Sequence, residues 1–260
     1  MKSALTYREP DTPLKWQDLP QGELVLSKIN EALVPWSTKF FGYHLLKIGA
    51  LSQGLDCSQS PIKHQVSIVT ANTATNIANN NSNNEAPSAK QNSTSTIVAD
   101  VDDLPILEHS VDVCLLGHVL EFSVDPHHVL REASRVLIPN GYMVLTGYNP
   151  ISLAGLNKFI PYRGNSLPWR EQFFTPMRVK DWLELMGFEI LDDIRLLHST
   201  LSGGGTSVKG GQSSFVTTWQ KFASRYLGPF GSIYIIVAKK RVHPLTPIKP
   251  KWRLRPSLQP

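Results

Sequence analysis

Short apolar runs recur along the chain and predict buried β-strands. Strands of a sheet that is covered on both faces are almost continuously apolar, whereas half-exposed strands alternate between apolar and polar residues. The run that ends before Gly49 predicts a first strand of the covered kind. The other predicted strands are residues 64–69, 96–100, 111–117, 142–147, 188–191 and 232–238, with a turn over residues 139–141.

Several segments between these runs have the spacing of an amphipathic helix instead. Residues 127–137 place five apolar side chains on one helical face, and residues 21–33 show a similar stripe. Thr175 and Pro176 have the form of a helix cap followed by a proline in the first turn, and Gly187 predicts the end of that helix. A further helix is predicted over residues 215–227.

Strands that alternate with helices imply an α/β fold with a mainly parallel sheet and helices on both faces. In such sheets, ligands bind beyond the carboxyl ends of the strands. Gly49, Asp100 and Gly117 each come at the end of a predicted strand, so we expect them on one rim of the sheet.

The composition divides the chain into a lead-in (residues 1–36), a main domain (residues 37–240) and a tail (residues 241–260). Residues 70–96 are dominated by Asn, Thr, Ser and Ala. Such a segment buries too little apolar surface to offset the entropy of ordering it, so we expect a disordered insertion. The 260 residues, 41% of them hydrophobic, suffice for one sizeable core.

The charge and the cysteine content limit the partners, metal sites and cellular compartment that we expect for this protein. Seven basic residues follow Ala238, and without them the net charge of +5 becomes −2. This basic, proline-rich tail fits a solvated end or, less well, a contact with nucleic acid or anionic lipid. Cys57 and Cys114 form neither a disulfide framework nor a metal-binding spacing, and no metal site is predicted. No apolar stretch is long enough to span a membrane, and a cytoplasmic protein is expected.

Four segments, in order, resemble the type 11 class I S-adenosylmethionine (SAM)-dependent methyltransferases. Residues 98–106 resemble their "GDAxxLPF" segment, and residues 110–121 resemble "SFDxVxxxxvLEH". Residues 129–141 are similar to "vLrEixRVLkPGG" almost position by position, and residues 177–189 resemble the later helix that ends in "GFE". The resemblance implies a Rossmann-like, mainly parallel seven-stranded sheet with an antiparallel last strand.

The same resemblance implies SAM as the cofactor and assigns residues to it. Asp100 and the backbone N–H of Val101 would hold the adenine, and Gly117 and His118 would lie on the sulfonium side. Gly49 belongs to the donor-binding loop. A turn-capping role for Asp100 and a packing role for His118 are the alternatives.

The donor loop departs from the family pattern "vLDxGxGxG". Gly49 is kept, but Lys47 takes the place of the acid, and Leu51 and Gln53 take those of the second and third glycines. After the second strand only Asn72 stands where an acid normally binds the ribose hydroxyls, and an amide lacks the charge-assisted part of that bond.

The function predicted from these features is methyl transfer to a small-molecule acceptor. Tyr148, Asn149 and Ser152, after the fifth strand, are candidate substrate-side groups, and no catalytic residue is assigned. One alternative is a non-catalytic binding or regulatory protein that kept the core and lost the donor loop. The other is a nucleic-acid methyltransferase anchored by the tail, although no "[DNS]PP[YFW]" motif occurs. The glycine-rich residues 203–211 are expected to be a substrate lid or a linker.

Overall fold

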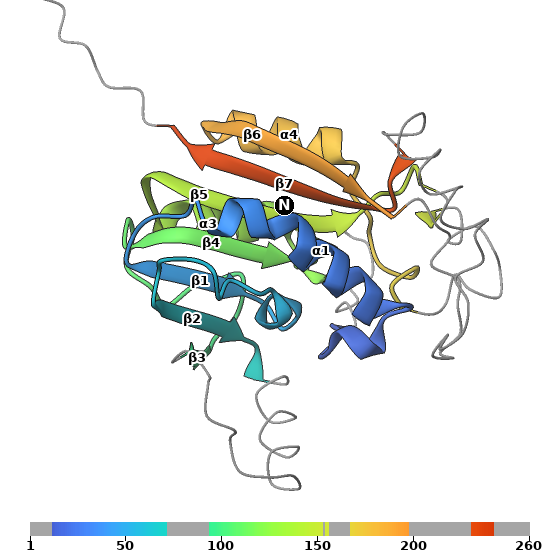
Figure 1. Ribbon diagram of the computed structural model, residues 1–260, viewed down its shortest axis with the longest axis horizontal. Helices are drawn as coiled ribbons and strands as arrows, with labels where there is room; N and C mark the ends of the chain where they lie inside the picture. Colours follow the sequence, from blue (N-terminus) through green and yellow to red (C-terminus); the bar gives the residue numbers. More distant parts are fainter. Residues whose placement is uncertain (1–11, 72–93, 153, 156–166, 198–229, 242–260) are drawn as a thin grey trace, which may run out of the picture.

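The described residues form one seven-stranded sheet, shown in Figure 1. The computed structural model describes residues 12–71, 94–152, 154–155, 167–197 and 230–241. The spatial order is β3-β2-β1-β4-β5-β7-β6, in which β3 to β5 run parallel and β7 is antiparallel to both of its neighbours. The strands are β1 (His44–Ile48), β2 (His64–Val69), β3 (Thr94–Val98), β4 (Val111–Gly117), β5 (Leu137–Tyr148), β6 (Phe188–Leu196) and β7 (Ile233–Lys240).

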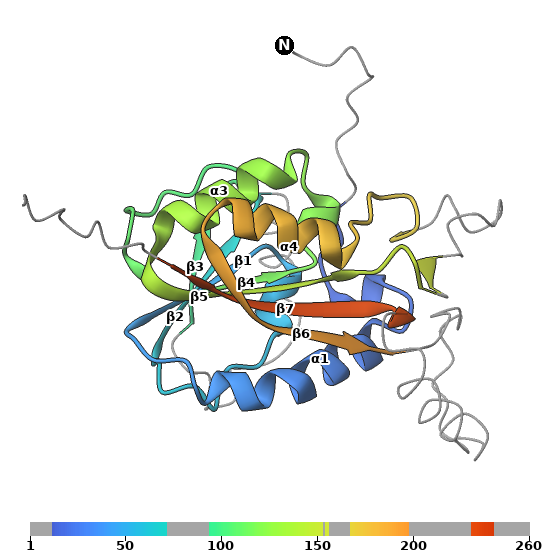
Figure 2. The ribbon, with the colours of Figure 1, turned by 90° about the horizontal axis from the view of Figure 1, so that it is seen from above.

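Helices cover both faces of the sheet (Figure 2). On one side lies α1 (Gly22–Ser37), which buries Val25, Ile29 and Leu33 against the sheet. On the other side lie α3 (Pro126–Val136) and α4 (Pro176–Leu185), whose apolar side chains belong to a separate core cluster. The fold class predicted from the sequence is therefore confirmed, including the antiparallel last strand.

Local sequence signals account for the helix ends. The side chain of Asp125 accepts hydrogen bonds from the backbone N–H groups of His127 and His128, which begins α3. Thr175 caps α4 through the N–H of Arg178, as predicted. Gly187 follows α4 with φ of 84°, a left-handed conformation that favours glycine.

Two predictions differ from the structure in detail. The turn predicted over residues 139–141 lies inside β5, because the strand begins at Leu137 and pairs with β4 on both sides of an irregularity. The left-handed Asn140, with φ of 65°, lies in this irregular part. The third strand ends at Val98, so Asp100 lies two residues beyond it.

Some predicted segments lie outside the described residues. They are most of the Asn-rich insertion, the glycine-rich residues 203–211, the helix over residues 215–227 and all but the first residue of the tail. Within the described parts, no helix has the length and apolarity needed to cross a membrane. The same residues contain no group of three His, Cys, Asp or Glu side chains placed to hold a metal ion.

Candidate functional site

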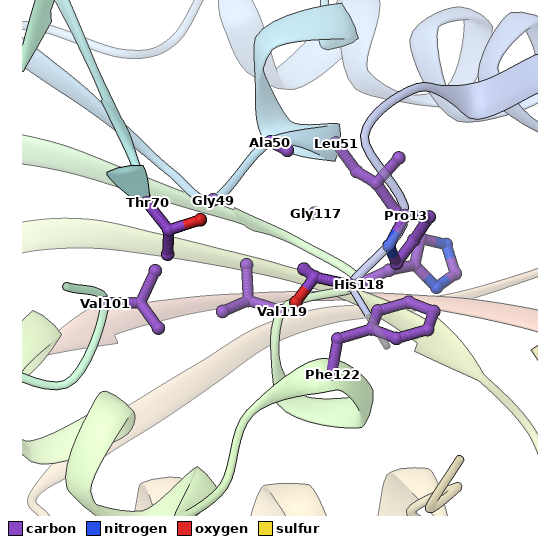
Figure 3. Close-up of a pocket in the computed structure, with 11 residues that line it drawn as sticks. Pro13, Gly49, Ala50, Leu51, Thr70, Val101, Gly117, His118, Val119 and Phe122 are labelled. Atoms are coloured by element: carbon purple, nitrogen blue, oxygen red, sulfur yellow. The ribbon is translucent and has the colours of Figure 1, made fainter. Parts of the chain in front are cut away.

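A cavity of about 70 Å³ lies at the carboxyl ends of β1, β2 and β4 (Figure 3). This is where the chain turns from the β1-β2-β3 half of the sheet to the β4-β5 half, the usual ligand position in such folds. The lining residues are Thr12, Pro13, Gly49, Ala50, Leu51, Thr70, Val101, Gly117, His118, Val119 and Phe122.

Four of the six predicted donor-binding residues line this cavity: Gly49, Val101, Gly117 and His118. They come from the ends of β1 and β4 and from the loop after β3, so the fold brings together positions that are far apart in sequence. Asp100 is exposed and does not line the cavity. Asn72 lies outside the described residues.

Gly49 has a backbone that requires glycine. Its φ is 85°, and a Cβ added there would lie 2.8 Å from Cγ2 of Val119. Its N–H donates to the carbonyl oxygen of Ile68, which fixes the turn out of β1 against β2. The glycine that survives from the family's donor loop is therefore the one that the turn itself demands.

A short 3-10 helix, η2 (Leu51–Gly54), takes the place of the rest of the glycine loop. Its Ser52 is fully buried, and the hydroxyl donates to the carbonyl oxygen of Ile48 and accepts from the N–H of Gly117 at 2.6 Å. A Cβ on Gly117 would lie 3.1 Å from Ser52. Ser52 thus ties the ends of β1 and β4 together directly beside the cavity.

Lys47, which stands where the family has an acid, points away from the cavity. Its Nζ donates to the carbonyl oxygen of Leu55 at 2.7 Å, and the side chain is buried. Burial lowers the pKa of this amine, an effect opposed by the nearby Cys57 and Asp56. Lys47 therefore stabilises the end of η2 and does not line the cavity.

The N-terminal segment crosses the outer side of the site. Thr12 and Pro13 line the cavity, and Trp16, in the 3-10 helix η1 (Trp16–Asp18), follows directly. The indole N–H of Trp16 donates to the carbonyl oxygen of Leu51 at 2.8 Å. Its ring meets the ring of His118 edge-on, with 5.3 Å between the centroids. Part of the predicted lead-in therefore belongs to the site.

His118 lies at the centre of a buried polar cluster that also contains Glu121 and Tyr148. All three side chains are at most 1% exposed. The Nδ1 atom of His118 lies 3.5 Å from Oε1 of Glu121, and its ring centroid lies 4.4 Å from that of Tyr148. The same Oε1 accepts the backbone N–H of Tyr148 at 2.6 Å. Burial and the charge of Glu121 raise the pKa of the Tyr148 hydroxyl.

Several polar atoms of this cluster have no hydrogen-bond partner among the described residues. They are both ring nitrogens of His118, Oε2 of Glu121 and the hydroxyl of Tyr148. His118 also has a left-handed backbone, with φ of 53°, held by its N–H donating to the carbonyl oxygen of Thr146. Unpaired buried polar atoms and backbone strain both concentrate at functional sites.

Comparison with known proteins identifies the family. Residues 52–145 match the family described as a methyltransferase domain. The chain is 36% identical to the uncharacterized protein YafS of Escherichia coli (strain K12) over 250 residues, which covers 95% of this chain and 88% of YafS. A SAM-dependent methyltransferase of Thermotoga maritima has a similar fold, with a TM-score of 0.54 at 16% identity over 87% of this chain and all of the other. The chain is a relative of YafS that contains a methyltransferase domain, and its fold is that of the class I SAM-dependent methyltransferases.

A further protein of similar fold contains S-adenosylhomocysteine, the product that SAM becomes after methyl transfer. It is the N-methyltransferase NodS of Bradyrhizobium japonicum, in complex with S-adenosylhomocysteine. The TM-score is 0.52 at 12% identity, and the match covers 82% of this chain and 86% of NodS. At these identities the structural matches show a shared fold and no more.

The residues that line the cavity fit the adenosyl part of SAM. Val101, Val119 and Ala50 provide apolar walls suited to a flat base, and Thr70 brings a hydroxyl group to the end of β2 (Figure 3). For the methionine part, the described lining residues offer no carboxylate, and Leu51 brings a side chain to the place of the family's second glycine. Among the described residues, the departures seen in the sequence thus lie at Lys47 and in η2, on the side where the family's glycine loop would be.

Sequence reasoning missed Thr70, Ser52 and Trp16. Thr70 directly follows a correctly predicted strand, so its position was available from the sequence, but an acid was sought there. Of the candidate substrate-side groups, Asn149 and Ser152 stabilise the loop after β5. Asn149 donates to the carbonyl oxygen of Gly231, and Ser152 donates to that of Asn149. Neither lines the cavity.

Proposed function

We propose that the protein binds SAM in this cavity and transfers the methyl group to a small-molecule acceptor. The observation that carries the proposal is the convergence of Gly49, Val101, Gly117 and His118 on one cavity at the switch point of the sheet. These residues were selected from the sequence through a family resemblance, independently of where the cavity lies.

The chain's contribution to this reaction is mainly positioning. SAM supplies an electrophilic methyl group, and the transfer requires the acceptor to be held in line with it. Val101 and Val119 would flank the adenine, and the hydroxyl of Thr70 would lie near the ribose. Gly117, without a side chain, leaves room for close approach on the sulfonium side.

The size of the cavity implies movement on binding. Its 70 Å³ is below the roughly 300–1,000 Å³ of typical small-molecule sites. The outer wall includes Thr12 and Pro13, which precede the first element of the fold rather than belonging to the sheet. We expect this segment to shift when the donor enters.

Calorimetric titration of SAM and S-adenosylhomocysteine into the full-length protein tests the proposal. Val101→Trp fills the cavity and should abolish binding. The matched control is Val98→Trp, because Val98 is 54% exposed on β3 and does not line the cavity. Binding that survives Val101→Trp in a folded variant would show that the donor lies elsewhere.

A second pair of variants tests the predicted adenine contact of Asp100. Asp100→Ala is compared with Asp103→Ala, an exposed acid in the same loop. Weaker binding in Asp100→Ala alone would mean that the exposed carboxylate turns toward the adenine in the complex. Equal affinities would support a turn-capping role.

One specific feature favours a non-catalytic binding protein as the second candidate. The 3-10 helix η2 and the inward-facing Leu51 occupy the region of the family's glycine loop, and Lys47 replaces its acid. If neither SAM nor S-adenosylhomocysteine binds at millimolar concentration to the folded protein, this candidate replaces the enzyme. The nucleic-acid hypothesis rests on tail residues outside the described part and stays a prediction.

A further inference from the structure

Glu121, Tyr148 and the ring nitrogens of His118 form a buried cluster, and none of these groups was given a role in the donor binding proposed above. Burying a polar atom without giving it a hydrogen-bond partner destabilises the folded state. Four such atoms lie within this one cluster among the described residues. One member of the cluster, His118, lines the proposed active site, so the unpaired atoms can serve the chemistry of that site.

The geometry gives the two ring nitrogens of His118 different surroundings. Nδ1 faces Oε1 of Glu121 at 3.5 Å, a separation that a small adjustment turns into a hydrogen bond. A carboxylate at this position favours the tautomer that carries its proton on Nδ1. The other nitrogen, Nε2, then presents a lone pair that no described residue uses.

Glu121 is itself held in place. Its Oε1 accepts the backbone N–H of Tyr148 at the end of β5, and the side chain is 1% exposed. A histidine oriented by a buried carboxylate, with its second nitrogen unpaired, is the usual arrangement of a general base. In structures without substrate, catalytic hydrogen bonds are often long.

We propose that His118 is the general base of this site, oriented by Glu121, and that the acceptor is therefore a nucleophile that loses a proton, such as a phenol or an amine. This deepens the proposed function and rests on it for the identity of the reaction. The acceptor heteroatom forms a bond to the methyl carbon, the carbon–sulfur bond of the donor breaks with its electron pair left on sulfur, and the acceptor proton passes to Nε2 of His118. An acceptor without such a proton, for example a thioether, needs no base.

The left-handed backbone of His118 is consistent with this role. A φ of 53° is uncommon for a residue with a side chain, and such strain persists where the position of a side chain matters for function. The structure provides an internal comparison. His109 has the same φ of 53°, but its Nδ1 lies 3.1 Å from the carbonyl oxygen of Leu137, outside the cavity.

The first experiment needs neither donor nor acceptor. Nitrogen-15 NMR of the histidine rings in the full-length protein reports which nitrogen of His118 carries the proton. We expect the Nδ1–H form, and we expect the ring signals to move in Glu121→Gln, which removes the charge and keeps an oxygen for the N–H of Tyr148. An Nε2–H form, or ring signals that are the same in both proteins, would overturn the proposal.

The second experiment measures transfer of labelled methyl groups from SAM to a panel of phenols, primary amines and thioethers. His118→Asn, assayed at saturating SAM, should lower the turnover of a phenol or amine by about 10²- to 10⁴-fold. His109→Asn is the matched control, since asparagine tolerates the left-handed conformation at both positions. Unchanged turnover in His118→Asn, or turnover of thioethers alone, would contradict the proposal. If SAM does not bind, the proposed function is wrong. The NMR experiment would still show which ring nitrogen of His118 carries the proton.

Discussion

Replacing Ser52 by alanine tests how the altered donor loop is stabilised. The serine hydroxyl is fully buried and joins the ends of two neighbouring parallel strands, β1 and β4. Alanine keeps the backbone of η2 and removes only the oxygen. Any loss of stability then reports on the hydrogen bonds and not on a change of fold.

The expected loss of stability follows from the buried backbone N–H group that the Ser52→Ala variant leaves without an acceptor. Without the hydroxyl, the N–H of Gly117 loses the acceptor that it now has at 2.6 Å and stays buried. An unsatisfied buried donor of this kind costs about 1–3 kcal/mol. At roughly 2–4 °C per kcal/mol for a protein of about this size, the midpoint of thermal unfolding should fall by several degrees.

Urea unfolding followed by circular dichroism measures this cost, with Ser110→Ala as the control. The hydroxyl of Ser110 also donates to a backbone carbonyl oxygen, that of Leu107, but in an exposed position where water can replace it. The control should change the free energy of unfolding by less than about 0.5 kcal/mol. If Ser52→Ala costs no more than this control, Ser52 does not stabilise the junction of the two strands.

Three further changes have expected outcomes. Because burial lowers the pKa of Lys47 below its ordinary value of 10.5, the unfolded chain binds more protons between those two pKa values, so stability should rise with pH in that window. Lys47→Met should remove this rise, as measured by urea midpoints at several pH values; an equal rise in the variant would assign it to other groups. Trp16→Phe keeps an aromatic ring but loses the N–H that binds the carbonyl oxygen of Leu51 and part of the buried indole, and should lower the free energy of unfolding by at least about 1 kcal/mol in urea titrations. Asp125→Ala removes the cap of α3 and should cost about 1 kcal/mol, whereas Asp125→Asn should retain most of the stability; equal losses in both would point to charge rather than capping.

The strands were predictable because a strand that is buried on both faces consists of an almost continuous run of apolar residues. The bounds of β2 and β4 agree with the prediction, since each apolar run is flanked by polar residues or glycine. The start of β5 was missed for a physical reason. The sequence Pro139-Asn140-Gly141 favours a turn, and the structure accommodates it as an irregularity within a strand that began earlier.

The site was only partly predictable. Gly49 and Gly117 could be found because a residue at the end of a buried strand has a fixed place in this kind of sheet. The roles of Ser52 and Trp16 arise from contacts that span 65 and 35 residues, and nothing near them in the sequence indicates these contacts. Whether Asp100 contacts the donor stays a prediction, because the strand before it ends earlier than the sequence pattern indicated.

The position of β1 in the sheet determines whether a fragment cut to the bounds of the family match can fold. The segment that matches the methyltransferase family, residues 52–145, excludes β1, although β1 lies between β2 and β4. A polypeptide cut to those bounds would lack a central strand, and the edges of β2 and β4 would be free to pair with other molecules. Aggregation of such a fragment would say nothing about the intact protein. Because β1 pairs with a neighbour on each side, a mutation in the unmatched residues 44–48 can be as damaging as one in the matched segment.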